Sequence, residues 1–267
     1  MTRTPYPDAR ATRIENAAQT LAGLYRSGTQ GECPPRDQHP ADIDEAFAIQ
    51  QRVTKLLEAD IGGWKCSLPG PSKTVLAPLY RPRIVFAQDS LRCIAPVDAG
   101  MAEIEPEIAY LIGDDLPSRA APYSLEEVLT AIRSTHMAFE LIGSRYRERA
   151  NVSFPMLLAD RLANDGLFVG PAIDLRPDNV ALEAMMLTLE GDGLPREQWW
   201  GQHPDGHPLM PLLWVANYLS QQAAGLRRGQ VVTTGSYHGV MRVAAGQALR
   251  MYFGPLGKLD VTIQAVT

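Results

Sequence analysis

The segment Glu103-Ile104-Glu105-Pro106-Glu107-Ile108-Ala109-Tyr110 alternates acidic with apolar residues and predicts a β-strand. Side chains two positions apart point to the same side of a strand, so Glu103, Glu105 and Glu107 are expected to share one face. Pro106 cannot donate to a neighbouring strand, which predicts an edge or a bulge here. Neighbouring carboxylates repel one another unless a cation lies among them, and hard oxygen ligands suit Mg²⁺ or Mn²⁺.

A bare Glu-x-Glu is more often a solvated strand face than a metal site. A third acid, Glu140, strengthens the metal hypothesis because it lies within the apolar run Met137-Ala138-Phe139-Glu140-Leu141-Ile142. An acid in a buried strand must be paired, protonated or bound to a metal. Arg145 is close enough along the chain to be an ion-pair partner. The residues alone therefore leave two alternatives open, a metal cluster and a Glu140–Arg145 ion pair.

Composition limits the class of protein. The 267 residues are 45% hydrophobic, enough to bury a large core, and the net charge of −5 comes with scattered basic residues, which disfavours a nucleic-acid partner. No apolar run approaches the ~18 residues that a membrane helix needs, and the polar N-terminus does not resemble a secretory signal. The three cysteines, Cys33, Cys66 and Cys93, do not suggest a disulfide framework. A cytoplasmic protein without membrane contact is expected.

Hydrophobic spacing predicts a helix over residues 11–26 and a second one that starts at Asp42 or Asp44 and ends at Gly62-Gly63. From residue 83 onward, short strands dominate, with helices over 125–134 and 211–224. The expected strands cover residues 104–112, 137–142, 167–169, 184–189, 231–234, 247–253 and 259–264. Strands that arrive partly as hairpins favour an α+β fold with a mixed or antiparallel sheet.

Separated stretches of the chain resemble the 2-keto-4-pentenoate hydratase and 4-oxalocrotonate decarboxylase branch of the fumarylacetoacetate hydrolase superfamily. Their order and approximate spacing match over nearly the whole chain. The stretches that carry the resemblance are Glu45-Ala46-Phe47-Ala48-Ile49-Gln50, Gly63-Trp64-Lys65, Glu105-Pro106-Glu107-Ile108-Ala109, Glu140-Leu141-Ile142-Gly143-Ser144-Arg145, the segment from His207 to Asn217, and Gly229-Gln230-Val231-Val232-Thr233-Thr234-Gly235-Ser236.

The resemblance implies a rolled mixed β-sheet with flanking helices, divided into a smaller helical N-terminal part (residues 1–80) and a catalytic domain (residues 81–267). It also implies a homo-oligomer that takes a small 2-oxo acid. The implied site residues are the metal ligands Glu105, Glu107 and Glu140 for Mg²⁺ or Mn²⁺, the catalytic residues Lys65 and Asp165, and the substrate-binding residues Asn164, Arg145 and Ser236.

Departures from the family pattern fall around the substrate. The family's Gly-Leu-Thr after the lysine is replaced by Ser67-Leu68-Pro69, and its Ala-Asp-Asn-Ala-Ser-Ser-Gly stretch is lengthened to residues 159–166. Lys65 could instead be a surface lysine, and Asn164-Asp165-Gly166 an ordinary turn. None of the five histidines is followed by Glu three positions later, so the His-x-x-Glu dyad of the superfamily's hydrolases is missing.

A metal-bound 2-oxo acid is polarised towards an enolate, so the resemblance implies a lyase. The first hypothesis is a hydratase that adds water to a 2-hydroxy-2,4-dienoate and gives a 4-hydroxy-2-oxo acid. The second is a decarboxylase of a 2-oxo-dienedioate of the 4-oxalocrotonate type. A third is a non-catalytic homologous subunit, in which the altered loop near Pro69 has abolished catalysis.

Overall fold

The computed structural model describes residues 8–71, 73–88, 91–174, 181–191, 193 and 195–265. The chain divides into two compact units whose segments alternate along the sequence. The first unit consists of residues 1–59, 71–73 and 144–163, and the second of residues 60–70, 74–143 and 164–267. The predicted division at residue 80 stays a prediction.

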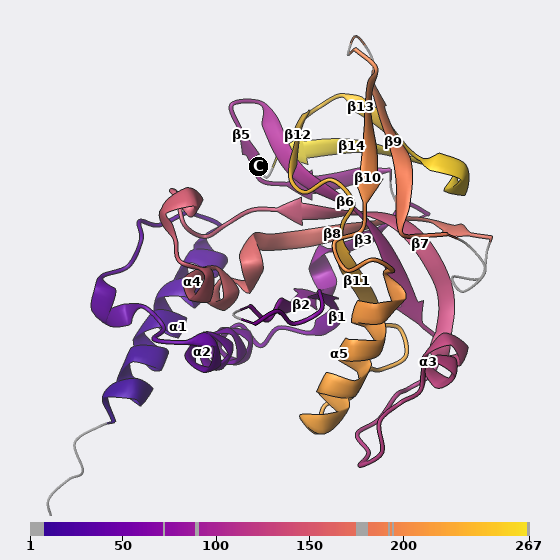
Figure 1. Cartoon of the computed structure of the whole chain (residues 1–267). Coiled ribbons are helices and arrows are strands. Elements are labelled where there is room, and N and C mark those ends of the chain that lie inside the picture. The colour runs from indigo at the N-terminus through magenta and orange to yellow at the C-terminus, as the bar shows by residue number, and fades with distance from the viewer. Residues whose placement is uncertain are drawn as a thin grey trace, which may run out of the picture. The chain divides into compact units, whose positions relative to one another are not determined.

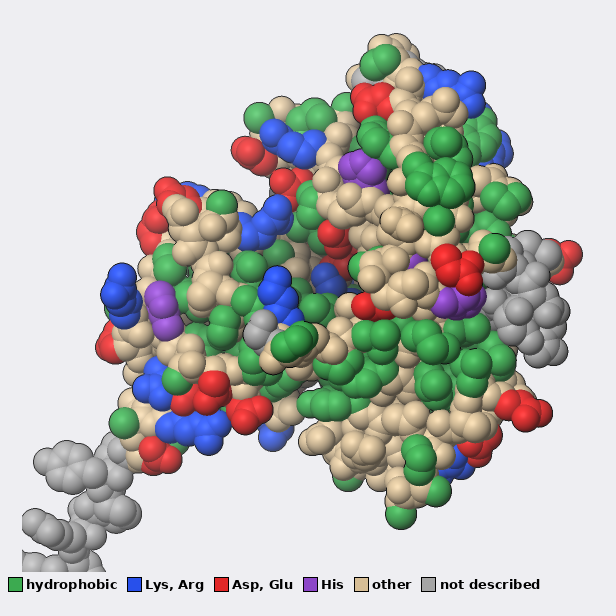
Figure 2. Space-filling view, viewed as in Figure 1, with side chains coloured by type: hydrophobic (Ala, Val, Ile, Leu, Met, Phe, Trp, Pro, Cys, Tyr) green, Lys and Arg blue, Asp and Glu red, His purple; other side chains and the backbone are tan. Residues whose placement is uncertain are grey.

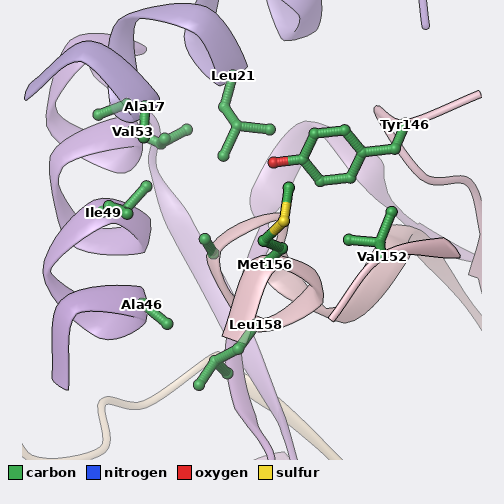
Figure 3. Close-up of a cluster of buried hydrophobic side chains, with 11 residues drawn as sticks. Ala17, Leu21, Ala46, Ile49, Val53, Tyr146, Val152, Met156 and Leu158 are labelled. Carbon is green, nitrogen blue, oxygen red and sulfur yellow. The ribbon is translucent and has the colours of Figure 1, made fainter. Parts of the chain in front are cut away.

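The first unit is helical, as its amphipathic spacing predicted. Its α-helices are α1 (Ala9–Ser27), α2 (Ile43–Leu56) and α4 (Phe154–Ala159). The carboxylate of Asp42 accepts the Glu45 amide at 2.8 Å and so caps α2 at the first of the two predicted positions. Figure 3 shows apolar side chains of these helices and of the segment around Tyr146 converging on one core.

The second unit contains two mixed sheets, drawn in Figure 1. One has nine strands: β1 (Ile61–Cys66), β2 (Leu76–Tyr80), β3 (Ile84–Phe86), β5 (Val97–Asp98), β6 (Met101–Ile112), β7 (Ile132–Ile142), β8 (Asn164–Ile173), β11 (Val231–Ser236) and β12 (Met241–Ala244). The other has five: β4 (Arg92–Ala95), β9 (Ala184–Gly191), β10 (Glu197–Gln202), β13 (Ala248–Phe253) and β14 (Lys258–Ala265). The remaining helices of the described residues include α3 (Leu125–Ala131) and α5 (Leu209–Gln221).

The order β2-β1-β11-β6-β7-β8-β3 in the large sheet decides where the site forms. β1 runs parallel to β11, whereas β11, β6, β7 and β8 pair antiparallel with one another. Both pairings occur in one sheet, so the predicted α+β fold with a mixed sheet is confirmed.

Residues 61–66 and 76–80 are strands β1 and β2 of the large sheet. Two helix ends were predicted wrongly. The second helix ends at Leu56, and Gly62-Gly63 belongs to β1. A Cβ at Gly63 would lie 2.0 Å from the Val231 carbonyl oxygen, so the glycine allows β1 and β11 to approach. The helix predicted over 125–134 ends at Ala131, and β7 starts at Ile132.

Pro106 lies in β6, a central strand, so of the two predicted alternatives, an edge or a bulge, only the irregular position remains. The partner of β6 changes near this residue, from β12 opposite residues 101–104 to β11 opposite residues 107–111, with an irregular register on the β11 side. Pro106 therefore stands where the ladder on that side is interrupted, and a missing N–H is tolerated there. Its carbonyl still accepts the Tyr237 amide at 3.0 Å.

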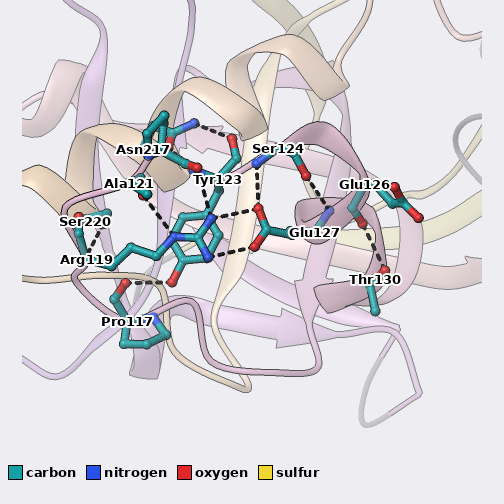
Figure 4. A network of polar contacts seen from close by, with 11 residues as sticks. Pro117, Arg119, Ala121, Tyr123, Ser124, Glu126, Glu127, Thr130, Asn217 and Ser220 are labelled. Carbon is teal, nitrogen blue, oxygen red and sulfur yellow. Dashed lines mark hydrogen bonds and ion pairs between the residues drawn. The ribbon is translucent and has the colours of Figure 1, made fainter.

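A polar network fixes α3 to α5 within the second unit (Figure 4). The Arg119 guanidinium binds both oxygens of Glu127 at 2.6 and 2.7 Å and stacks on the Tyr123 ring. Asn217 of α5 accepts the Tyr123 amide at 2.6 Å and donates to the Tyr123 carbonyl. Asn217, the last residue of the segment 207–217 quoted for the resemblance, thus connects α5 to the loop before α3.

Positive and negative side chains are interspersed on the face seen in Figure 2. Within the described residues, every helix is too short or too polar to span a membrane.

Candidate metal centre and active site

The register of β6 on β7 places Glu105 directly opposite Glu140. Glu107 lies two residues further along β6, on the same face as Glu105. Each of the three glutamates offers one carboxylate oxygen, and these three oxygens all lie within 4.8 Å of one another. Glu107 and Glu140 are 2% and 0% exposed. Like charges opposite each other destabilise a sheet, so the cluster needs positive charge close by.

Lys65 supplies one positive charge. Its Nζ lies 2.5 Å from Oε1 of Glu140, and the lysine is 9% exposed. Burial lowers the pKa of Lys65, but the charges of Glu140, Glu105 and Glu107 outweigh it and raise the pKa above its ordinary value. Lys65 is therefore a buried ammonium and not a surface lysine, which resolves the alternative left by the sequence.

Glu107 is held by strand β11. One of its oxygens, Oε2, accepts hydrogen bonds from the Thr233 hydroxyl and, at 3.2 Å, from the Gly235 amide. Burial, followed by the charges of Glu140 and Glu105, raises the pKa of Glu107 to about 8, while Lys65 and the Thr233 hydrogen bond act in the opposite direction. Without a further cation, the site therefore favours a proton on this carboxylate near neutral pH.

Glu140 presents an open coordination position. Its Oε1 accepts from Lys65 and, at 2.9 Å, from Nδ2 of Asn164. Its Oε2 is buried and makes no hydrogen bond with any described residue. A buried carboxylate oxygen without a donor is costly in a folded protein, and a hard cation would satisfy it. The donor set and this oxygen fit a divalent metal ion.

The family model for the fumarylacetoacetate (FAA) hydrolase C-terminal region matches residues 65–264, from Lys65 to the last strand. The chain belongs to this family. The chain is 25% identical over 259 residues to 2-hydroxyhexa-2,4-dienoate hydratase of Comamonas testosteroni, which covers 93% of this chain and 96% of the relative. It is also 29% identical over 157 residues to 4-oxalocrotonate decarboxylase of a Pseudomonas species, covering 59% of each.

A solved structure shares the fold. The 4-oxalocrotonate decarboxylase from Pseudomonas putida G7, complexed with magnesium and adipate, superposes with a TM-score of 0.73 at 18% identity, covering 96% of this chain and 98% of that one. The fumarylacetoacetate hydrolase-like fold predicted from the sequence is confirmed.

The structure gathers five of the eight predicted site residues. Asn164 joins the three glutamates and Lys65, and it is fully buried. Asp165 does not join them: neighbouring side chains of β8 point to opposite faces, and its carboxylate pairs with Arg83, whose Nε also donates to the Asp165 carbonyl at 2.9 Å. This geometry gives no support to a catalytic role for Asp165.

Arg145 belongs to the first unit, where its backbone amide donates to Asp160 at 2.8 Å and its guanidinium lies over the Tyr25 ring. Within the second unit, Glu140 forms its ion pair with Lys65. Ser236 is the last residue of β11 and comes directly after Gly235, which contacts Glu107. Its hydroxyl accepts the Gly239 amide at 2.9 Å, in the turn after the strand.

Two contacts of the site were missed. Thr233 and Gly235 hold Glu107, and both stand in the segment quoted for the resemblance, but neither was assigned a role. Alternation along β11 places Thr233 and Gly235 on one face, which was the available signal.

Proposed function

We propose that the chain is a metal-dependent lyase that hydrates a 2-hydroxy-2,4-dienoate, or its keto form, to a 4-hydroxy-2-oxo acid. One observation carries the proposal: three glutamates and a buried lysine form a single cluster in a chain that resembles a dienoate hydratase over almost its full length. The four residues of the cluster belong to the second unit, and all four lie within the residues that the family model matches.

Glu105, Glu107 and Glu140 would hold Mg²⁺ or Mn²⁺. When bound, such an ion supplies Lewis acidity, which stabilises negative charge on the carboxylate and keto oxygens of a 2-oxo acid. The chain's own groups set the geometry. Thr233 and Gly235 orient Glu107, and Asn164 orients Glu140, so the carboxylates need little reorganisation when the ligand binds.

Lys65 has the role of a fixed cation. Its ammonium group has three donors, and Glu140 uses one of them. We infer that another donor reaches an oxygen of the bound acid and stabilises the negative charge that develops there. Burial keeps water away from this contact and strengthens it.

The assay uses purified protein with and without Mg²⁺, a 2-hydroxy-2,4-dienoate and a 2-oxo-dienedioate of the 4-oxalocrotonate type, followed by ultraviolet absorbance and CO₂ release. Metal-dependent loss of dienoate absorbance without CO₂ supports the hydratase. CO₂ release from the dienedioate would replace it with the decarboxylase, which the second relative favours.

A non-catalytic subunit would consume neither compound, and in calorimetry it would show no metal-dependent uptake of a 2-oxo acid. That result would contradict both enzymatic proposals. Location in the cytoplasm and assembly into a homo-oligomer stay predictions of the sequence.

A further inference from the structure

Two adjacent strand ends hold the carboxylates of the proposed site. β1 and β11 are parallel, with Lys65 paired to Thr233, so both strands leave the sheet at the same edge. Lys65 contacts Glu140, and Thr233 contacts Glu107. Whatever fixes these two strand ends therefore fixes the positions of the groups around the site.

The loop of residues 203–205, between β10 and α5, is tied to the end of β1. The Oδ2 atom of Asp205 accepts the Ser67 hydroxyl at 2.8 Å and the Leu68 amide at 2.9 Å. Ser67 and Leu68 directly follow β1, and Pro69 and Gly70 come next. The Ser67 backbone amide donates separately to the Val75 carbonyl at 3.2 Å.

The same loop is tied to the end of β11. The His203 imidazole lies edge-on to the Tyr237 ring, with 5.4 Å between the centroids. Its Nε2 would be 3.6 Å from a Cβ at Gly235, whose amide donates to Glu107. Nδ1 of His203 accepts the Asp205 amide at 3.2 Å, which braces the loop internally. The loop thus bridges the two strand ends.

We propose that Asp205 is a positioning residue for Lys65. By holding Ser67 and Leu68, it fixes the chain two and three residues after Lys65, and so constrains the backbone from which the lysine side chain reaches Glu140. This inference rests on the proposed function, in which Lys65 donates to an oxygen of the bound 2-oxo acid. Displacements of about 1 Å in a catalytic group can cost up to about 100-fold in rate.

Ser67 fits this role. Its hydroxyl is a donor and reaches the Asp205 carboxylate at 2.8 Å, so the two residues should act as a pair.

The test uses the full chain with Mg²⁺ and oxalate, a stable analogue of a 2-oxo acid, in calorimetry. Asp205→Ala should weaken oxalate binding at least fivefold and lower kcat/KM about tenfold, while the affinity for Mg²⁺ changes less than twofold. Asp205→Asn should recover much of the loss, because its amide oxygen can still accept the Leu68 amide. Hydrogen exchange at the Leu68 amide should quicken about tenfold in Asp205→Ala.

A matched control is Asp115→Ala. This aspartate also accepts a backbone amide, that of Arg228 at 2.7 Å, but on another loop, and its loss should leave oxalate affinity unchanged. The route through Lys65 is tested in the Lys65→Met background, where Asp205→Ala should change oxalate affinity less than twofold.

The outcomes separate the two proposals. If the wild type converts dienoates but Asp205→Ala binds oxalate and turns over normally, the positioning role is wrong. If the wild type binds oxalate without converting any dienoate, the hydratase proposal fails and the oxalate measurements still decide the role of Asp205. A wild type that binds no oxalate with Mg²⁺ overturns both.

Discussion

Replacing Lys65 with methionine should destabilise the metal-free protein far more than an ordinary lysine substitution. Methionine keeps most of the apolar stem and removes the charge. Glu140, which is 0% exposed, then loses the cation at 2.5 Å and faces Glu105 across the sheet. Removing one partner of a buried ion pair costs about 3–5 kcal/mol, because the remaining charge is left in a poorly solvating environment.

The matched control is Lys258→Met. Nζ of Lys258 lies 3.4 Å from Asp260, with both side chains partly exposed, and Asp260 keeps Arg250 as a second partner. Exposed pairs of this kind contribute about 0–1 kcal/mol. The two variants should therefore differ by at least about 2 kcal/mol in the free energy of unfolding.

Urea unfolding at pH 8 in EDTA measures the difference, and one further condition tests its cause. Saturating Mg²⁺ should shrink the cost, because the ion supplies positive charge to the cluster. If Lys65→Met and Lys258→Met unfold at the same urea concentration in EDTA at pH 8, Lys65 does not stabilise the acidic cluster and the account of the site is wrong.

Three further outcomes are expected. Glu107→Gln should weaken Mg²⁺ binding in calorimetry by more than about 10-fold, because even the loss of residues that only orient metal ligands costs about 10- to 100-fold in affinity. Glu103→Gln, on the same strand, should leave the affinity unchanged, and equal affinities of the two variants would refute the ligand set. Burial lowers the pKa of His203 from 6.5 to about 4, so the folded chain binds fewer protons than the unfolded chain between these values, and stability present above pH 6.5 is lost as the pH falls. Between pH 6.5 and 5, the free energy of unfolding of the wild type should therefore fall by up to about 2 kcal/mol more than that of His203→Asn. Urea unfolding measures both, and an equal fall in the two proteins would contradict this. Gly63→Ala should lower the free energy of unfolding by more than about 3 kcal/mol or abolish soluble expression, because its new Cβ would lie 2.0 Å from a backbone oxygen of β11. Gly23→Ala, with open space around it, should be tolerated.

The acidic part of the site could be predicted because the strand period is local information. Alternation along residues 103–108 placed Glu105 and Glu107 on one face, and the apolar run around Glu140 marked it as a buried acid. The structure confirms that these three side chains meet. The ion-pair partner of Glu140 was not predictable in this way, because Lys65 is 75 residues distant in sequence and pairs through strand order, not through spacing.

The errors have equally local causes. Glycine commonly ends a helix, so Gly62-Gly63 was interpreted as a helix end and strand β1 was not predicted. The reason for the glycine is the close approach of Val231 on β11, which is far away in the sequence. Ile132 continues the apolar spacing of Val128 and Leu129 in α3, so the pattern does not show where the helix ends. Asn164 and Asp165 look alike as polar turn residues, yet the strand that contains them sends one toward Glu140 and the other toward Arg83.

The charges of the cluster explain why a divalent ion, and not a monovalent one, suits it. Three carboxylates and one ammonium carry a net charge of −2 when all are ionised. Without a metal, the raised pKa of Glu107 lets a proton offset part of this charge. A divalent ion displaces that proton and leaves the buried site near neutral, whereas a monovalent ion would leave an uncompensated charge in a poorly solvating interior. Lys65 also limits the total attraction, since without it the cluster would carry −3 and hold both ion and proton more tightly. Metal binding should accordingly release a proton below pH 8, and calorimetry in buffers of different ionisation enthalpy would detect it.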